Sequence, residues 1–495
     1  MTLKKNRLPF GKLLEGLTAE HAYPDQMVTG VTADSRRVKP GYIFVALKGE
    51  KQDGSAFVPA ALAAGAVAIL CDMEASITVP SGVILIHHKN PRYLFSRIAA
   101  RFYASQPRVM VGVTGTNGKT SVAYFYAQIC HLLGYQSAAL GTIGILSGDG
   151  SPLPIPHEGL TTPEPEQLHA SLAALAELGI THAAMEASSH GLSQYRLHGV
   201  ELTAAAFTNL SHDHLDYHGT EAAYFDSKMM LFSEILPKGA TAVINADSVM
   251  APQVMARCEA RGDMICSFGE NGVNIKVKNI KQSIDKQTIT VEYPGGCDTI
   301  DIPLVGSFQV SNVLCALGLV AASGIELKKA IAVLPSLKGV PGRMEKVPGN
   351  MGSPAVIVDY AHTPDGLEKA LQELKILTRG KLWVVFGCGG DRDKTKRPKM
   401  GTIAAALADK VVVTDDNPRT ENAGHIRRAI MEGCPEATEI ADRKDAIAFA
   451  VSQATEGDTV LIAGKGHEKY QLTGTQKMPF DDVRTAEEMI QKMSA

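Results

Sequence analysis

The feature that most constrains the fold is an apolar run that leads through a glycine-rich turn into a helical pattern. The run RVMVGV ends at Val113, the turn TGTNGKT covers 114–120, and the pattern TSVAYFYAQICHLL follows. A buried strand that delivers such a turn to a helix N-terminus is the arrangement that cradles phosphate. The general phosphate-loop pattern asks for Gly where this chain has Val113. This order of strand, turn and helix predicts a parallel α/β core. An ordinary strand-to-helix turn, without phosphate binding, remains the alternative for the loop.

This loop carries the groups that bind a nucleoside triphosphate. Gly115 and Gly118 let backbone N–H groups come close to phosphate oxygens. The ammonium of Lys119 is placed to neutralise the β- and γ-phosphates, and the hydroxyl of Thr120 to bind Mg²⁺. The predicted ATP-binding residues of the loop are Thr114, Gly115, Thr116, Asn117, Gly118, Lys119 and Thr120.

The size and charge of the chain limit its partners. Its 495 residues are enough for about three domains, and 45% hydrophobic residues supply their cores. A net charge of -3 gives no reason to expect nucleic acid or an acidic membrane, so we expect small-molecule partners. We also expect a monomer. Eight cysteines form no CxxC pair, which indicates reduced thiols rather than zinc or disulfide sites. We find neither an export signal nor an apolar run long enough to span a membrane, which predicts a cytoplasmic protein.

Three parts of the chain differ in their patterns, so we predict an α/β protein of three domains. Residues 1–105 form an α/β domain, in which 57–70 predicts a short helix, a glycine stop and a buried strand. Residues 106–340 favour a mostly parallel sheet covered by helices, and 274–305 then alternate as a small antiparallel sheet does. Residues 341–495 repeat the strand and helix alternation, which predicts a doubly wound, Rossmann-like domain.

Four polar segments follow predicted strands in the last domain, namely AHTPD, GCGGDRDK, DDNPRTE and GKGHEKY. Ligands of doubly wound sheets bind beyond the carboxyl ends of the strands. These four segments are therefore predicted to share one rim and to bind a ligand there.

Acidic and histidine residues in the middle domain are candidates for binding a metal. Glu186 directly follows the apolar run AAM, and the segment TNLSHDHLDYHG adds His212, Asp213, His214, Asp216 and His218. His214 and His218 have the spacing of zinc ligands on a helix, but no Cys or third ligand accompanies them, and oxygen-rich surroundings favour Mg²⁺. The alternatives are a solvated or capping Glu186 and loop histidines that only form hydrogen bonds.

Six segments together give the chain a family resemblance. TGTNGKTS, MEASSHGL, FTNLSHDHLDYHG, GRMEKV, DYAHTPD and GCGGDRDKTKRP resemble the Mur ligases of peptidoglycan synthesis, in order and over all three domains. That family's own phosphate motif is TGTNGK followed by Thr or Ser, which accounts for the missing glycine. The segment TADSRRVKPGYIFVALKGEKQDG resembles the family's uridine-nucleotide domain, and DNPR at 416–419 resembles the members that add meso-diaminopimelate.

The resemblance implies a reaction. The γ-phosphate of ATP passes to the side-chain carboxylate of D-glutamate in UDP-N-acetylmuramoyl-L-alanyl-D-glutamate, and the amine of meso-diaminopimelate then displaces phosphate to leave an amide. A carboxylate is a poor electrophile, whereas an acyl phosphate has a good leaving group. ATP is therefore expected as a substrate, and Mg²⁺ as the metal that neutralises phosphate charge.

The resemblance also implies catalytic and metal-binding residues. A carbamate would make Lys228 an anion able to face Mg²⁺, although the local sequence alone indicates an exposed helical lysine. The implied catalytic residues are Lys119, Glu186, His214 and Lys228, and the implied metal ligands are Thr120, Glu186, His214 and Lys228 as carbamate.

Four further residues are implied to contact the nucleotide, namely Asn312, Arg343, Asp359 and His362. Many relatives have Asn or His-Asn where this chain has Phe308-Gln309, so we leave Gln309 out of this set. The local alternative for Asp359 and His362 is a capped turn before Pro364.

The remaining implied residues bind the two other substrates. Arg419 is the expected partner of the second carboxylate of diaminopimelate, because arginine pairs carboxylates bidentately, and Asp416 with Asn417 would receive an ammonium group. The local alternative is an Asx-Pro turn. The residues implied for the UDP-sugar peptide are Ser35, Thr161, Thr162, Ser188, Gln194 and Arg196, and those for the amino acid are Arg392, Asp416, Asn417, Pro418, Arg419, Gly464 and Glu468.

Other functions remain open at this level. A lysine-adding Mur ligase or a folylpolyglutamate synthase would share the ATP loop but use another acceptor, and DNPR and the amino-terminal DSR segment argue against both. A P-loop kinase or motor ATPase would phosphorylate a hydroxyl or need no third domain. A non-catalytic scaffold would bind ATP without releasing phosphate.

Overall fold

The structure is a computed structural model that describes residues 6–18, 26–49, 52–211, 213–350 and 352–493. The chain divides into two compact units. The first consists of residues 1–276 with 312–331, and the second of residues 277–311 with 332–495. Each unit is described by itself below.

The first unit begins with a small all-parallel sheet in the order β3-β4-β5-β6. Residues 57–70 form the predicted helix, a glycine with positive φ at Gly65, and a buried strand. Leu70 and Ile98 belong to the core that the sheet shares with α3. The elements are β1 (Leu8–Pro9), α1 (Phe10–Leu14), β2 (Met27–Val28), β3 (Gly30–Thr32), η1 (Ser35–Arg37), β4 (Tyr42–Val45), η2 (Gly54–Phe57), α2 (Val58–Ala63), β5 (Ala68–Asp72), β6 (Ile84–His88) and α3 (Pro91–Tyr103).

A larger sheet follows in the order β13-β12-β11-β7-β10-β8-β9. Its neighbours pair in parallel, except that β9 runs antiparallel to β8, which the sequence pattern did not predict. The strands are β7 (Val109–Thr114), β8 (Ser137–Gly141), β9 (Gly144–Ser147), β10 (His182–Glu186), β11 (Ala204–Phe207), β12 (Thr241–Asn245) and β13 (Met264–Gly269). All six residues of β7 are buried, as expected for a central strand covered on both faces.

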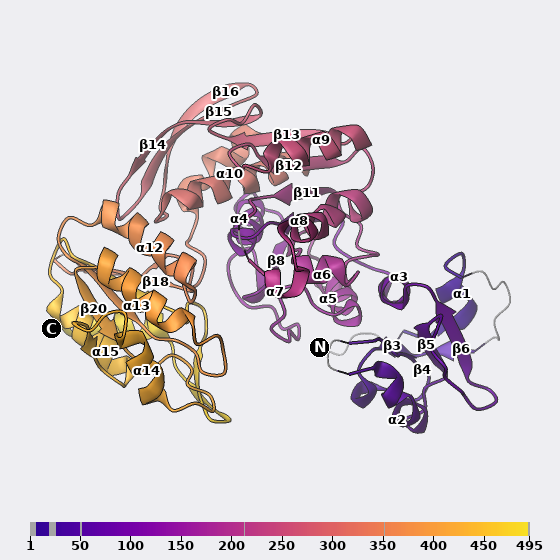
Figure 1. Ribbon diagram of the computed structural model, residues 1–495. Helices are drawn as coiled ribbons and strands as arrows, with labels where there is room; N and C mark the ends of the chain where they lie inside the picture. The colour runs from indigo at the N-terminus through magenta and orange to yellow at the C-terminus, as the bar shows by residue number, and fades with distance from the viewer. Residues whose placement is uncertain (1–5, 19–25, 50–51, 212, 351, 494–495) are drawn as a thin grey trace. The chain divides into compact units, whose positions relative to one another are not determined.

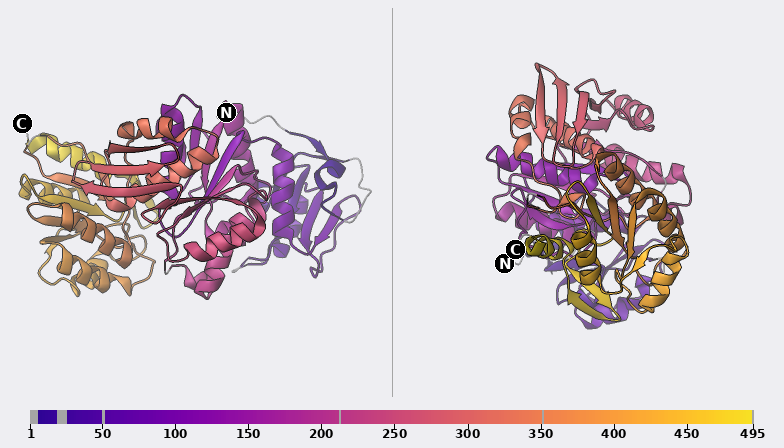
Figure 2. Two further views of the ribbon diagram at one scale, coloured as in Figure 1. Left: turned by 90° about the horizontal axis from the view of Figure 1, so that it is seen from above. Right: turned by 90° about the vertical axis from the view of Figure 1, so that its left-hand side faces the viewer.

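Helices cover this sheet, and their chain order gives the predicted strand and helix alternation (Figures 1 and 2). They are α4 (Lys119–Leu132), α5 (Pro165–Glu177), α6 (Ser189–Ser193), α7 (Leu215–His218), α8 (Glu221–Met230), the π-helical turn η3 (Leu231–Ile235), α9 (Ala251–Arg261) and α10 (Ser307–Ala322). β7 lies between β10 and β11, and Val113 is level with Glu186. The loop after β7 therefore emerges beside the ends of both neighbouring strands.

Residues 274–305 form three strands, β14 (Ile275–Gln282), β15 (Gln287–Tyr293) and β16 (Gly296–Ile302). β15 and β16 form the predicted antiparallel pair. The prediction was incomplete for β14, because Ile275 and Lys276 pair in parallel with the end of β13. The alternating pattern shows which strand face is buried, but it does not determine the direction of the neighbouring strand.

The second unit contains a sheet in the order β17-β18-β22-β19-β20-β21, parallel except for β17. Ile357 and Leu461 face one core, whereas Val358 and Ile462 face another, as the two-residue period of a strand requires. Both faces are thus covered, which confirms the doubly wound prediction. The strands are β17 (Glu345–Lys346), β18 (Ala355–Asp359), β19 (Leu382–Phe386), β20 (Lys410–Val413), β21 (Thr438–Glu439) and β22 (Thr459–Ala463).

Helices alternate with the strands of this sheet, as predicted, and a further helix follows the last strands. They are α12 (Pro364–Leu377), α13 (Lys396–Leu407), α14 (Ala423–Met431), α15 (Arg443–Gln453) and α16 (Asp482–Met493). The short elements α11 (Leu327–Ala332) and η4 (Leu334–Ser336) precede β17, and the hairpin β23 (Tyr470–Thr473) with β24 (Gln476–Pro479) follows β22. Across the described ranges, we find no helix with the length and apolar character that crossing a bilayer requires.

Candidate active site

The loop between β7 and α4 depends on its two glycines. Gly115 has φ 145° and Gly118 has φ 86°, which are backbone conformations that other residues adopt only with strain. A Cβ on Gly115 would also collide with the hydroxyl of Thr208, and one on Gly118 with the side-chain oxygen of Asn312. Asn312, predicted to contact the nucleotide, therefore lies directly against the loop. The N-terminus of α4 and the loop N–H groups form a cradle suited to an anion.

Two lysine ammonium groups meet at this loop. Lys119 Nζ donates to the carbonyl oxygens of Gly115 at 2.8 Å and Thr116 at 2.7 Å. Lys228 Nζ donates to the same Gly115 oxygen at 2.9 Å and lies 4.2 Å from the centre of the Tyr224 ring. Lys228 is only 1% exposed, and burial together with the charge of Lys119 lowers its pKa well below the usual range. The helical lysine is thus buried at the loop, not exposed as its local sequence indicates.

The carboxylate of Glu186 lies beside the start of α4. It is 2% exposed, and its Oε1 accepts hydrogen bonds from Thr120 Oγ1 at 2.9 Å and from the Thr142 backbone N–H at 2.7 Å. Its Oε2 accepts from Thr142 Oγ1 at 3.2 Å. Two predicted metal ligands, Thr120 and Glu186, are thus in contact. Hydroxyl and carboxylate oxygens are the donors that Mg²⁺ prefers, so the pair fits that ion.

Sequence reasoning missed Thr142. The residue follows β8 directly, and a Cβ on the preceding Gly141 would overlap the Glu186 carboxylate. A Gly-Thr pair at the end of β8, the strand beside the Glu186 strand β10, could have indicated a close approach, but the sequence does not say which strands are neighbours.

The histidine segment forms an aromatic cluster. The His190 ring lies 4.9 Å from that of His214 and 5.5 Å from that of His218. His214 has φ 52° just before α7, and its Nε2 is 3.4 Å from Asp213 Oδ2. Burial, then the nearby His190, lowers the pKa of His218 to about 4. His212 lies outside the described residues.

The structure joins only part of the predicted metal site. Within the described part of the chain, no hydrogen bond links His214 or Lys228 to Glu186. The described residues also contain no group of three His, Cys, Asp or Glu arranged to hold a metal ion. Thr120 and Glu186 are therefore the two predicted ligands whose contact the described residues show.

The segment predicted to bind the UDP-sugar peptide is attached to the end of β10. Thr162 Oγ1 donates to the backbone oxygen of Glu186 at 2.9 Å and accepts from the Ser188 N–H at 3.0 Å. Arg196 donates to the backbone oxygen of Thr162 and to Gln194 Oε1, both at 2.8 Å. Five of the six predicted residues are thereby brought together: Thr161, Thr162, Ser188, Gln194 and Arg196.

Ser35, the sixth residue, begins η1 in the domain that contains the β3-β4-β5-β6 sheet. Its neighbours link that domain to the same segment, since Thr32 donates to Glu166 Oε1 at 3.1 Å and Arg37 pairs with Glu158 at 3.0 Å. Glu166 is 5% exposed, and burial raises its pKa to about 7. No described hydrogen bond joins Ser35 itself to the other five.

Three predicted nucleotide contacts cluster in the second unit. The Arg343 guanidinium lies 4.7 Å from the centre of the Tyr360 ring, a packing that leaves it near Asp359. Asp359 accepts from two backbone N–H groups, those of Met344 and Ala361, while His362 Nδ1 lies 2.8 Å from the Tyr360 oxygen. The capped turn therefore exists, and it carries the candidate residues. Gln309, which is not among the predicted nucleotide contacts, donates to the backbone oxygen of Arg343 at 3.2 Å.

The predicted rim of the second unit is confirmed around Asn417. Its Oδ1 accepts from Lys465 Nζ at 2.8 Å and from the Leu472 N–H at 2.9 Å, and its Nδ2 donates to Glu468 Oε2 at 2.8 Å. Both lone pairs of Oδ1 are used here, so Asn417 would exchange one of these partners to receive the predicted ammonium of the substrate. Asp416 and Glu468 are the acidic groups beside it.

Sequence reasoning also missed Lys465, although it stands between two predicted residues in GKGHE. Its side chain is fully buried, and its Nζ is 3.5 Å from Glu468 Oε2. Burial lowers the pKa of Lys465, while Asp416 opposes that shift. Gly464 is required beside it, because φ is 118° and a Cβ would lie 2.6 Å from Asp416 Oδ2.

The two predicted arginines lie on the same rim. Arg419, after the buried Pro418, has φ 52°, and its NH1 donates to the Gly390 oxygen at 2.8 Å. Arg392 is exposed and donates to the Asp391 oxygen at 3.2 Å. Neither guanidinium forms an ion pair with a carboxylate among the described residues. Both are partly exposed and can meet an anionic ligand.

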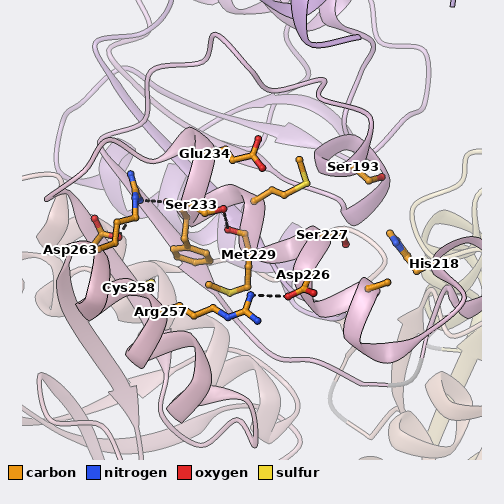
Figure 3. Close-up of a pocket in the computed structure, with 14 residues that line it drawn as sticks. Ser193, His218, Asp226, Ser227, Met229, Ser233, Glu234, Arg257, Cys258 and Asp263 are labelled. Atoms are coloured by element: carbon orange, nitrogen blue, oxygen red, sulfur yellow. Dashed lines mark hydrogen bonds and ion pairs between the residues drawn. The ribbon is translucent and has the colours of Figure 1, made fainter. Parts of the chain in front are cut away.

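A separate cavity of about 600 Å³ lies beside α8 (Figure 3). Its lining comes from α6, α7, α8, η3 and α9, with His218 of the histidine cluster among the residues, and Arg257 donates to Asp226 at 2.8 Å across its edge. None of residues 114–120 is among those that line it. The contacts described above, not this cavity, therefore define the candidate active site.

Comparison with known families covers most of the chain. Residues 27–103 match the Mur ligase family catalytic domain, residues 113–320 the Mur ligase middle domain, and residues 342–466 the Mur ligase glutamate ligase domain. These matches fall on the small parallel sheet, the loop-bearing sheet and the doubly wound sheet, respectively.

Individual relatives extend the match over nearly the full length. A curated UDP-N-acetylmuramoyl-L-alanyl-D-glutamate–2,6-diaminopimelate ligase of Brucella melitensis is 47% identical over 455 residues, 92% of each chain. One of Zymomonas mobilis is 45% identical over 97% of this chain and 98% of its own. A solved structure of such a ligase superposes with a TM-score of 0.72 at 34% identity, covering 99% of this chain and 100% of that one. The chain therefore belongs to the Mur ligase family.

Proposed function

We propose that this chain joins meso-2,6-diaminopimelate to the D-glutamate side chain of UDP-N-acetylmuramoyl-L-alanyl-D-glutamate and converts ATP to ADP and phosphate. The observation that carries this proposal is the near-full-length similarity to ligases with that printed activity. Loop, peptide segment and rim supply residues suited to the three substrates. The product is a precursor of peptidoglycan.

The first step transfers the γ-phosphate to a carboxylate. A substrate carboxylate oxygen forms the new O–P bond as the bond to ADP breaks, which gives an acyl phosphate. The main obstacle is repulsion between two anions, so positive charge and exact alignment matter most. The α4 N-terminus supplies N–H donors, and Lys119 exchanges its contacts with Gly115 and Thr116 for phosphate oxygens.

Mg²⁺ fits beside this loop on the chemistry of its donors. Thr120 and Glu186 supply a hydroxyl and a carboxylate, and we assign His214 and carbamylated Lys228 as further ligands. When bound, the ion acts as a Lewis acid that neutralises developing phosphate charge. Carbamylation would also replace one of two ammonium groups on the Gly115 oxygen with an anion, which removes their mutual repulsion.

The second step forms the amide. A neutral amine of diaminopimelate attacks the acyl carbon, the C–N bond forms, the bond to phosphate oxygen breaks, and the amine releases its proton. On the rim, Asp416 and Asn417 would hold the ammonium group at the amino-acid end, with Glu468 beside them. Arg419 would pair the distal carboxylate, which distinguishes diaminopimelate from lysine.

We also propose how the substrates divide among the domains. The uridine nucleotide is assigned to residues 1–105, ATP to 106–340 and the amino acid to 341–495. Ser35 belongs to the first, and Asn312 stands beside the loop of the second. The protein is proposed to act as a monomer in the cytoplasm, where its nucleotide substrates are made.

Isotope transfer tests the acyl phosphate directly. The substrate is labelled with ¹⁸O in the D-glutamate side-chain carboxylate and incubated with ATP, Mg²⁺ and diaminopimelate. We expect one labelled oxygen in the released phosphate, because that oxygen bridges carbon and phosphorus in the intermediate. Amide product accompanied by unlabelled phosphate would overturn the mechanism.

A further inference from the structure

We propose that Thr142 is a positioning residue that couples the peptide-binding segment to the carboxylate of Glu186. The inference builds on the proposed function and adds a residue that the family resemblance did not supply. Thr142 stands between two predicted sites: its hydroxyl is 3.2 Å from Glu186 Oε2 and 3.0 Å from Thr161 Oγ1.

The chemistry of the three groups fixes the direction of both hydrogen bonds. An ionised carboxylate only accepts, so the single hydroxyl proton of Thr142 goes to Glu186. Thr142 Oγ1 must then accept from Thr161, whose hydroxyl is the donor of the second bond. The result is a one-way chain from Thr161 through Thr142 to the carboxylate.

The two oxygens of Glu186 are held differently. Oε1 has two donors, Thr120 Oγ1 and the Thr142 N–H, whereas the one described donor to Oε2 is the Thr142 hydroxyl. The terminal torsion of a glutamate is soft, so a carboxylate needs donors on both oxygens to keep its plane. The Thr142 hydroxyl therefore controls the orientation of a predicted metal ligand.

The peptide segment also contacts the backbone of Glu186, since Thr162 Oγ1 donates to the backbone oxygen of Glu186 at 2.9 Å. A ligand that orders residues 161–162 thus acts on both the main chain and the side chain of Glu186. Binding of the UDP-sugar peptide should consequently tighten binding of the magnesium nucleotide, and by linkage the reverse must hold equally.

The test measures this coupling by calorimetry. The dissociation constant of MgADP is determined with and without UDP-N-acetylmuramoyl-L-alanyl-D-glutamate, for wild type, Thr142→Val, Thr142→Ser, Thr161→Val and the double valine variant. Valine keeps the shape and removes the hydroxyl, whereas serine keeps the hydroxyl. We expect Thr142→Val to lose most of the coupling and to lower kcat by about tenfold, and Thr142→Ser to restore both.

Non-additivity separates coupling from general destabilisation. Because the chain is serial, Thr161→Val should add little to Thr142→Val. The matched control is the exposed pair Thr290 and Thr299 on β15 and β16, hydrogen-bonded at 2.9 Å, whose double valine variant should leave the coupling unchanged. Thr161→Val tests the same chain independently should Thr142→Val fold poorly.

Three results would overturn the inference: wild-type protein without coupling, Thr142→Val with wild-type coupling, or additive effects of the two valine substitutions. If the wild-type enzyme is active and any of these results is found, only the role of Thr142 is refuted, and the proposed function stands. Absence of phosphate release from wild-type enzyme with all three substrates would instead refute the proposed function.

Discussion

The loop between β7 and α4 and the rim around Asn417 in the second unit hold their charged groups in different ways. At the loop, Glu186 and Lys228 are 2% and 1% exposed, and each is hydrogen-bonded within the first unit. On the rim, Lys465 is equally buried, but Arg419 and Arg392 are partly or fully exposed and bind only backbone oxygens. The groups proposed for phosphoryl transfer are thus buried in the core, whereas the arginines proposed to choose the amino acid are carried by loops.

We propose that this contrast separates the residues that carry out phosphoryl transfer from those that select the amino acid. Changes at the loop should abolish turnover with every amino acid. Changes at the rim should alter which amino acid is used, with little effect on nucleotide binding.

The largest effect is expected for Lys119→Met. The substitution removes the ammonium that is proposed to neutralise the β- and γ-phosphates, so phosphate release at saturating substrates should fall by roughly 10³. Lys329→Met, at an exposed residue on α11 paired with Glu326, is the control and should retain wild-type turnover. A less than tenfold loss for Lys119→Met would place the phosphate-binding charge elsewhere.

Arg419→Ala should have the next largest effect and should be confined to the amino acid. Because Arg419 is only partly buried, losing its bidentate pair should lower kcat/KM for diaminopimelate by roughly 10- to 100-fold. Calorimetric binding of MgADP should not change. Arg484→Ala, at an exposed arginine paired with Glu488, is the control. Unaltered preference for diaminopimelate over lysine would refute the assignment of Arg419.

Lys465→Met tests the buried part of the rim. The side chain of similar length removes one of the two donors to Asn417 Oδ1 and loosens the orientation of that amide, so KM for diaminopimelate should rise about tenfold and kcat should change less. Lys477→Met is a matched control, because both lysines lie over the Tyr470 ring, Lys465 Nζ at 5.9 Å and Lys477 Nζ at 3.8 Å from its centre, but Lys477 is on the exposed hairpin. Equal effects of both variants would mean that a nearby positive charge, not the orientation of Asn417, matters.

Glu166→Gln should affect stability rather than turnover. Burial raises the pKa of Glu166 from 4.5 to about 7, so the folded state keeps a proton that the unfolded state loses. Its contribution to stability is full below pH 4.5 and is lost as the pH rises through about 7, a change on the order of 3 kcal/mol. Urea unfolding should show the variant more stable than wild type at pH 8, with a flatter pH profile between these values.

One result would contradict the prediction for Glu166→Gln. Identical pH dependence of unfolding in the variant and the wild type would mean that Glu166 is ionised and solvated in the folded protein. Glu164→Gln is the control, because its carboxylate is partly exposed and pairs with Arg196 at 2.7 Å.

Much of the fold could be predicted from the sequence. Buried parallel strands are nearly continuous apolar runs, so β7, β19 and β22 stand out, and the helices between them follow from their periodicity. The hairpin of β23 and β24 has no such signal, because its strands are short and largely exposed. The parallel pairing of β14 depends on tertiary contacts that the local pattern does not contain.

The candidate site was predictable only where a motif carries its own geometry. The glycines and Lys119 of the loop act within seven consecutive residues, 114–120, so their arrangement follows from local order. Thr142 and Glu186 lie on different strands, and their contact depends on which strands are neighbours. The roles of Asn417 and Lys465 depend on hydrogen bonds to the hairpin and to Glu468, which no spacing in the sequence indicates.

The most direct test of the account is phosphate release from MgATP and UDP-N-acetylmuramoyl-L-alanyl-D-glutamate with meso-diaminopimelate, with L-lysine, or with no amino acid. We predict sustained release with diaminopimelate only, because we propose that the loop activates the carboxylate and that Arg419 selects the amino acid. Equal release with lysine would contradict the role of the rim, and no release in any mixture would contradict the ligase itself.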